Sequence, residues 1–277
     1  MNVLEAMAAA TRERVKREKE RVPFLELERK VREGEGAERE KPLGFKEALF
    51  QKSPLFPIIA EWKRRSPSEG LLAKEGQTLE ETVSAYEKGG AAALSILTEP
   101  QFFAAREGDF SGAAQRTRLP LLKKDFILDP YQIYQAKAQG ARAILLMVSL
   151  VQGRELEALY REALGLGLDS LVEVHTLEEG QEALKMGATL IGVNSRNLKN
   201  LETRLEVAQG LLPRLKSLAP PGTLLVAESG VHGPEDILRV KEAGAEAALV
   251  GTYLMRSPDP ERALQDLTRA TVEARGA

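Results

Sequence analysis

The chain has 277 residues, of which 43% are hydrophobic and 29% are charged, a composition typical of soluble globular proteins. Lys and Arg (39) nearly balance Asp and Glu (41), so the formal net charge of -2 offers no electrostatic footprint for nucleic acid or an anionic membrane. The sequence has no cysteine and only two histidines, which excludes disulfides, thiolate zinc sites, cysteine nucleophiles and a His-rich metal site.

The longest apolar run, residues 143–151 interrupted by one serine, is shorter than the roughly 18 residues that a membrane-spanning helix needs. The N-terminus has the pattern of a charged helix and not of a signal peptide. We therefore expect a cytoplasmic protein without metal or cofactor, in which a few local residues hold any bound anion. Abundant Glu, Arg and Leu without Cys also fits a heat-adapted host.

Residues 1–52 differ from the rest of the chain and predict a helical extension. Apolar residues recur at helical spacing between Val3 and Ala10, and residues 13–21 carry charges of both signs, as a solvated helix surface does. The apolar stripe needs a surface to cover. We expect these helices to pack across one end of the domain that residues 53–277 form.

From residue 57 onward, the sequence repeats a cycle of an amphipathic helix, small residues around a glycine, and a short apolar strand with a polar end. Glycine just past a helix end is the expected left-handed cap. Short runs that are apolar throughout are typical of parallel strands buried on both faces. The eight predicted strands are Pro57–Lys63, Ala92–Leu97, Pro120–Lys124, Ala143–Val148, Ser170–Val174, Leu190–Asn194, Thr223–Glu228 and Ala247–Gly251.

Eight strand–helix units predict an α/β fold, a closed (β/α)8 TIM barrel with additional N-terminal helices. Such a barrel carries its active site at the carboxyl ends of its strands. An open, doubly wound sheet is the alternative, although the first strand lacks the G-x-G-x-x-G sequence that the dinucleotide-binding form of that fold would show.

Polar residues follow these strands at equivalent positions. Lys124 shares a strand face with Leu122, and Glu173 with Leu171, because side chains two apart on a strand point the same way. Each residue alone would be read as an exposed loop charge, but the recurrence of acids and amines indicates one site. The set comprises Glu61, Lys63, Lys124, Glu173, Asn194, Arg196 and Glu228.

Convergent acids and amines in a partly dry cavity perturb one another's pKa values. A lysine held protonated between carboxylates can donate a proton to a carbonyl oxygen, and a buried glutamate can accept one. The constellation therefore predicts acid–base catalysis.

The loops after the last two strands predict a phosphate site. Ser229-Gly230 and Gly251-Thr252 each precede helical sequence, and barrels commonly bind phosphate there through backbone N–H groups and a helix N-terminus. Each glycine alone would indicate a simple turn. Lys63 and Ser66 are placed to close such a site from the first loop.

The pattern of polar residues at the strand ends gives no catalytic role to three other residues. We expect His175 at the surface or behind the site, because it lies beyond Glu173 and a helix pattern follows at once. His232 is expected in a loop. Trp62 has the parity opposite to Glu61 and Lys63, so it should pack between the barrel and its helices.

Six ordered segments resemble the indole-3-glycerol phosphate synthase family, and they span nearly the whole barrel. The strings E-x-K-x-x-S-P-S and K-D-F-I-x-D-P-Y-Q are rarely found together outside that family. The segments are Ile59–Ser68, Leu94–Glu99, Leu122–Gln132, Leu171–His175, Ile191–Leu198 and Ala227–Gly230.

The resemblance implies a (βα)8 carboxy-lyase of tryptophan biosynthesis. Its reaction closes the ring of 1-(2-carboxyphenylamino)-1-deoxyribulose 5-phosphate to indole-3-glycerol phosphate, with loss of carbon dioxide and water. It also implies a phosphorylated small-molecule substrate, no cofactor or metal, and no nucleic-acid or membrane partner; a monomer is the favoured oligomeric state. In this family the extra helices lie over the active-site end, where residues 1–52 would act as a lid.

Residue roles follow by position from the same resemblance. Lys124 is similar to the general acid that protonates the ribulose carbonyl, Glu173 to the acid/base group of the later dehydration, and Lys63 to a group sharing proton transfer. Other positions match residues that hold the lysines and the substrate hydroxyls, namely Glu61, Asn194 and Glu228, and the residue that meets the anthranilate carboxylate, Arg196. The positions that match the phosphate site are Ser229, Gly230, Gly251 and Thr252, with Ser66 beside them. Those that match the wall for the aromatic ring are Phe126, Phe103, Pro67 and Leu198.

The chain departs from the family's usual pattern at Trp62, where a smaller aliphatic is usual, and at Ser195, which replaces a second asparagine. Residues 104–109 lack the usual Gly-Ser. Two alternatives stay open: another phosphosugar barrel enzyme, such as a phosphoribosylanthranilate isomerase, and a non-catalytic phosphate-binding barrel. The first would need a different acid–base pair, and the second would be expected to lose Lys63, Lys124 or Glu173.

Overall fold

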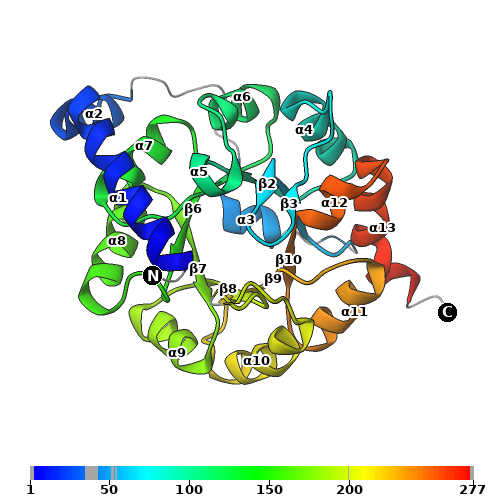
Figure 1. Cartoon of the computed structure of the whole chain (residues 1–277). Helices are drawn as coiled ribbons and strands as arrows, with labels where there is room; N and C mark the ends of the chain where they lie inside the picture. The colour runs from blue at the N-terminus through cyan, green and yellow to red at the C-terminus, as the bar shows by residue number, and fades with distance from the viewer. Residues whose placement is uncertain (1–2, 35–42, 51–52, 54, 199, 275–277) are drawn as a thin grey trace.

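The computed structural model describes residues 3–34, 43–50, 53, 55–198 and 200–274. Eight parallel strands close into a barrel in the order β1-β4-β5-β6-β7-β8-β9-β10, with β10 paired to β1, and helices surround it (Figure 1). The barrel strands are β1 (Ile58–Trp62), β4 (Ala93–Leu97), β5 (Leu121–Lys124), β6 (Ala143–Met147), β7 (Asp169–Val174), β8 (Leu190–Asn194), β9 (Leu224–Glu228) and β10 (Ala247–Val250).

These bounds agree with the eight predicted strands to within one residue at each end. The predicted fold class is therefore confirmed. The helices are α1 (Val3–Arg21), α2 (Phe24–Arg32), α3 (Phe45–Leu49), α4 (Leu79–Lys88), α5 (Pro100–Phe103), α6 (Asp109–Arg116), α7 (Pro130–Ala138), α8 (Gly153–Gly165), α9 (Leu177–Met186), α10 (Leu205–Leu218), α11 (Pro234–Glu242), α12 (Thr252–Arg256) and α13 (Pro260–Glu273).

Alternation along the strands creates two hydrophobic layers. Ile59 and Leu122 belong to the cluster inside the barrel, whereas Ile58 and Ile96 pack against the surrounding helices. Trp62 lies in the outer layer and is 1% exposed, as its parity predicts. The same alternation carries the polar residues at the strand ends into the mouth of the barrel.

Side-chain caps fix where several helices begin after the strands. Thr78, Asp129, Thr176 and Asp259 each accept a hydrogen bond from a backbone N–H in the first turn of the following helix. Each cap satisfies an N–H that would otherwise lack a partner. The caps therefore fix where the loops at the carboxyl ends of these strands end.

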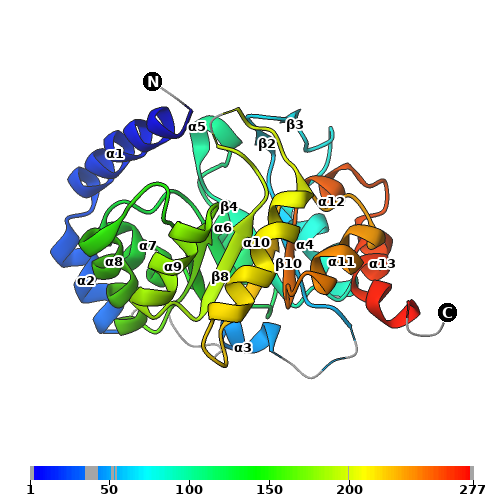
Figure 2. The same cartoon turned by 90° about the horizontal axis from the view of Figure 1, so that it is seen from below.

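The N-terminal helices do not all lie at one end of the barrel, so that part of the prediction is wrong. Helix α1 lies at the carboxyl ends of the strands and α3 lies at the opposite end (Figure 2). Asp169 at the start of β7 accepts a hydrogen bond from Lys46 N in α3 (2.9 Å), and the α3 side chain of Phe45 is fully buried in the barrel interior. The extension thus covers both ends.

Candidate active site

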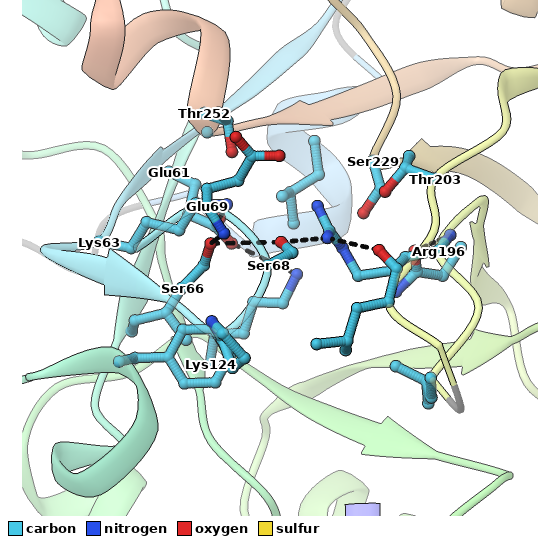
Figure 3. A pocket seen from close by; sticks show the side chains of 18 of the residues that line it. Glu61, Lys63, Ser66, Ser68, Glu69, Lys124, Arg196, Thr203, Ser229 and Thr252 are labelled. Carbon is cyan, nitrogen blue, oxygen red and sulfur yellow. Dashed lines mark hydrogen bonds and ion pairs between the residues drawn. The ribbon is translucent and has the colours of Figure 1, made fainter. Parts of the chain in front are cut away.

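The polar residues predicted at the strand ends converge on one cavity of about 420 Å³. Figure 3 shows Glu61, Lys63 and Lys124 on one side of it and Arg196 and Ser229 on the other. The predicted residues that line the cavity are Glu61, Lys63, Ser66, Pro67, Phe103, Lys124, Phe126, Glu173, Asn194, Arg196, Leu198, Ser229, Gly230, Gly251 and Thr252. The remaining one, Glu228, is fully buried and reaches the site through Lys124.

Two lysines and two glutamates form a continuous ion-pair network. Lys124 Nζ lies 2.9 Å from Glu228 Oε2 and 3.3 Å from Glu61 Oε1, and Lys63 Nζ lies 2.7 Å from Glu61 Oε2. The hydroxyl of Ser95 also lies 3.4 Å from Glu61 Oε1. Because Glu61 comes from β1 and Glu228 from β9, Lys124 at the end of β5 is held by carboxylates from two other strands of the barrel.

Burial and charge give these groups defined protonation states. Burial alone would raise the pKa of Glu61, but the ammonium groups of Lys124 and Lys63 lower it to about 2. Burial disfavours a charged Lys124, yet Glu228, Glu61 and Glu173 raise the pKa of its ammonium well above the ordinary value. Lys124 therefore carries a proton at neutral pH, which it can transfer to an oxygen that develops negative charge.

Glu228 and Glu173 have surroundings that differ from those of Glu61. Burial raises the pKa of Glu228, and repulsion from Glu173 adds to the rise against the pull of Lys124. Glu173 is 2% exposed, and its Oε1 has no hydrogen-bond partner within the described residues. A buried carboxylate that lines the cavity is suited to exchange a proton with a ligand.

Apolar side chains form one wall of the cavity. The rings of Phe103 and Phe126 are tilted by 49° with centroids 6.3 Å apart. Leu4 and Met7 from α1 line the same cavity, which places the predicted apolar stripe over the site. Pro67 also lines the cavity, so the wall offers an apolar surface for a planar ring.

The first loop meets the loop after β8 across the cavity. It contains a two-stranded hairpin, β2 (Arg65–Ser66) and β3 (Gly70–Leu71), that the sequence did not predict. The Arg196 guanidinium donates to Ser68 Oγ and to Leu201 O (3.2 Å), and the backbone N–H of Arg196 donates to Asn194 Oδ1 (2.9 Å). The guanidinium is therefore oriented at the cavity rim, where it can meet an anion.

The loops after β9 and β10 bring two pairs of small residues to the cavity. Ser229 and Gly230 both have left-handed backbones, with φ of 65° and 85°, and Thr252 begins α12. At Gly251 the need for glycine comes from the ion pair and not from a ligand. A Cβ there would lie 2.5 Å from Glu61 Oε2 and 2.9 Å from Lys63 Nζ.

Comparison with known proteins points to one family. The family model for indole-3-glycerol phosphate synthase matches residues 4–267. The indole-3-glycerol phosphate synthase of Carboxydothermus hydrogenoformans is 42% identical over 266 residues, which cover 95% of this chain and 98% of the relative. The chain belongs to the indole-3-glycerol phosphate synthase family. The synthase of Saccharopolyspora erythraea is 39% identical over 270 residues, which cover 98% of this chain and 96% of the relative.

Solved structures with low sequence identity share the barrel. Thiamine phosphate pyrophosphorylase from Pyrococcus furiosus is 20% identical, with a TM-score of 0.58 and coverage of 79% of this chain and 96% of that chain. A 3-hexulose-6-phosphate synthase is 14% identical, with a TM-score of 0.61 and coverage of 77% and 99%. At such identities the likeness shows the fold alone.

Two departures from the usual family pattern meet at Arg64. Its guanidinium lies over the Trp62 ring, 5.0 Å from the centroid, and its Nη2 lies 2.6 Å from Asp109 Oδ1. The aromatic ring and the carboxylate thus join the first loop to the loop after β4. The third departure, Ser195, is buried with an unpartnered hydroxyl, and nothing in the structure explains it.

Across the described ranges, no three or more His, Cys, Asp or Glu side chains are arranged as metal ligands. None of the described helices combines the length and apolarity that a membrane span requires. His232 is an exposed loop residue at the cavity rim, as expected. His175 lies behind the site, where its side chain is 14% exposed and approaches Glu173.

Several residues at the site were not singled out from the sequence. Leu97, Leu145 and Met147 line the cavity, and strand parity alone could have identified them. The contact between Arg14 and Asp125 (2.7 Å), which fixes α1 beside Lys124, joins residues 111 positions apart and has no sequence signal.

Proposed function

We propose that the chain catalyses ring closure of 1-(2-carboxyphenylamino)-1-deoxyribulose 5-phosphate to indole-3-glycerol phosphate, with loss of carbon dioxide and water. Family membership makes it a carboxy-lyase of tryptophan biosynthesis. The observation that carries the mechanism is a protonated Lys124 held between Glu61 and Glu228 beside an aromatic wall.

Lys124 acts as the general acid in ring closure. The aromatic carbon that bears the carboxylate attacks the ribulose carbonyl carbon, and the carbonyl oxygen takes the ammonium proton. Loss of carbon dioxide then returns the electron pair of the broken bond to the ring. Glu61 and Glu228 keep the amine aimed at that oxygen, because each lies within ion-pair distance of Nζ.

Glu173 acts in the dehydration that follows. The new hydroxyl leaves as water with one proton, and the neighbouring carbon loses another, so that a carboxyl group beside both can exchange protons. Lys63, paired to Glu61 at 2.7 Å, lies on the same side of the cavity and shares in proton transfer. Because acids and amines alternate, the net charge of the site stays near zero while protons are transferred.

The remaining residues bind the two ends of the substrate. The phosphate is assigned to the loops of Ser229, Gly230, Gly251 and Thr252, together with Ser66, since all five residues line the cavity and barrels commonly bind phosphate at the loops after the last two strands. Arg196 pairs with the anthranilate carboxylate, and Asn194 holds Arg196 and the substrate hydroxyls. The aromatic ring packs against Phe103, Phe126, Pro67 and Leu198.

The wider context is also a proposal. The substrate is a phosphorylated small molecule, as for the rest of the family, and helix α1 serves as a lid over its aromatic end. We place the protein in the cytoplasm and expect a monomer. Light scattering of the purified chain tests the oligomeric state.

The function is tested by adding the anthranilate–ribulose phosphate to purified protein and following indole absorbance and fluorescence with time. The single tryptophan gives a constant background, so a rising signal reports product. A stable signal from folded protein at saturating substrate contradicts the proposal. Product formed instead from phosphoribosylanthranilate would favour the isomerase alternative, which the family match does not support.

A further inference from the structure

His175 connects Glu173 to a second, half-buried carboxylate that the proposed reaction does not use. The imidazole Nε2 lies 3.5 Å from Glu173 Oε1, and its Nδ1 lies 3.5 Å from Glu179 Oε2. Neither ring nitrogen has another hydrogen-bond partner within the described residues, and neither does Glu173 Oε1. The imidazole is the side chain positioned to satisfy that oxygen.

Local structure fixes the second carboxylate in place. Glu179 lies in the first turn of α9, where its backbone N–H donates to the capping hydroxyl of Thr176 (3.2 Å). Its own carboxylate accepts from the backbone N–H of His175 (2.6 Å). This reciprocal pattern is a capping box extended by one residue, and it sets the ring of His175 between α9 and the end of β7.

The charge distribution around the ring favours the imidazolium. A neutral imidazole carries one N–H and would present a lone pair to one of the two carboxylates, whereas the cation donates to both. The charged groups that act on His175 are Glu173 on its own strand, Glu179 on α9 and, further away, Glu228 on β9. Burial opposes the cation, but Glu179 and Glu173 together raise the pKa of His175 above its ordinary value of 6.5.

We propose that His175 is a positioning residue: as an imidazolium paired with Glu179, it holds Oε1 of Glu173 and leaves the other carboxylate oxygen of Glu173 toward the substrate. The proposal rests on the dehydration role assigned to Glu173 above. Glu173 also interacts electrostatically with the cations Lys124 and Arg196, so His175 acts together with them on this carboxylate.

The ion pairs of His175 with Glu173 and Glu179 can be tested without measuring turnover. Because the chain has only two histidines, an NMR titration of the histidine ring protons gives two curves, and His232→Gln assigns them. We expect the His175 curve above about pH 6.5, with Glu179→Gln and Glu173→Gln each moving it down by about one unit or less. A His175 curve at or below that pH, unmoved by both variants, overturns the proposal.

Kinetics separate positioning from structural support. In His175→Asn the amide reaches only the Nδ1 position, so Glu173 loses its partner; in His175→Gln it reaches the Nε2 position and restores an uncharged donor. We expect kcat to fall about tenfold in His175→Asn, with KM within about twofold of the parental value. His175→Gln should recover part of the lost kcat.

Thr78→Ala is the matched control, because it removes the cap of α4, where Glu81 N donates to Thr78 Oγ1 (3.2 Å), and leaves Glu173, His175 and Glu179 unchanged. It should lower the melting temperature without lowering kcat. His175→Asn should be destabilised most below about pH 6.5, where the cation is present in both the folded and unfolded parent, and progressively less as pH rises through the raised pKa. A His175→Asn enzyme with parental kcat contradicts the proposal, even where the ring-closure function itself is confirmed.

Discussion

Replacement of Lys124 by Met tests the central claim of the mechanism. We expect turnover to fall at least about 10²-fold, the low end for loss of a general acid. Substrate binding should stay within about tenfold, because an acid that acts on developing charge contributes mainly in the transition state. Steady-state indole formation gives the rate, and a fluorescence titration under single-turnover conditions gives the binding.

The same substitution has a calculable effect on stability. Glu61 keeps Lys63 at 2.7 Å, but Glu228 is 0% exposed and loses its amine. Removing one partner of a buried pair costs about 3–5 kcal/mol. Proton uptake by Glu228, whose pKa is already raised by burial, should reduce this cost to about 1–3 kcal/mol. At about 2–4 °C per kcal/mol, the melting temperature should fall by about 2–12 °C.

The pH dependence of that loss follows from the sign of the Glu228 shift. In Lys124→Met the folded pKa of Glu228 lies above the unfolded value, so the protonated acid costs nothing at low pH and the deficit grows as pH rises through the folded pKa. Lys123→Met is the matched control: this neighbouring lysine points outward, with Nζ on Gln139 Oε1 (2.8 Å). It should keep full turnover. Binding lost in parallel with rate in Lys124→Met would refute the acid role and make Lys124 an anchor.

Three further predictions concern the lid, the ion pair and metals. Arg14→Met removes the 2.7 Å ion pair that holds α1 on the loop after β5; KM should rise severalfold with a fall in melting temperature of only a few degrees, and an unchanged KM would contradict the lid. Gly251→Ala introduces a Cβ 2.5 Å from Glu61 Oε2. We expect kcat to fall at least about tenfold and the free energy of unfolding to fall by about 1–3 kcal/mol. Gly210→Ala is the control: it lies on an open helix surface and should raise the free energy of unfolding by up to about 1 kcal/mol. EDTA should leave the rate unchanged, because the site carboxylates already have amine partners, and a loss restored by a divalent ion would refute the metal-free mechanism.

The barrel and the composition of its site were predictable because both follow from periodicity. Alternation along a strand decides which side chains enter the barrel, and the carboxyl ends of parallel strands meet at one end. Lys124 and Glu173 could therefore be grouped without knowing any contact between them. The family motifs added roles that periodicity alone does not give.

The contacts that tune the site were not predictable, because they depend on packing between residues far apart in the sequence. Gly192 shows the difference: its place in β8 was predicted, but a Cβ there would lie 1.9 Å from Glu228 Oε1. The glycine therefore provides the space in which the Glu228 side chain crosses the barrel toward Lys124. No local pattern distinguishes such a glycine from one that serves a turn.

The position of the N-terminal helices also depends on contacts that local sequence does not predict, and it connects the proposed lid with the candidate active site. Helical spacing showed that the apolar stripe of α1 needs a surface, but the choice of end depends on contacts with residues far along the chain, among them the ion pairs of Arg14 with Asp125 and of Lys19 with Asp129. Arg14 reaches Asp125, which directly follows Lys124, the proposed general acid, and accepts a hydrogen bond from Thr98 Oγ1 (2.8 Å). Helix α1, which contributes Leu4 and Met7 to the cavity, is thereby tied to the loop that follows Lys124. One ion pair therefore joins the proposed lid to the loop that follows the proposed proton donor.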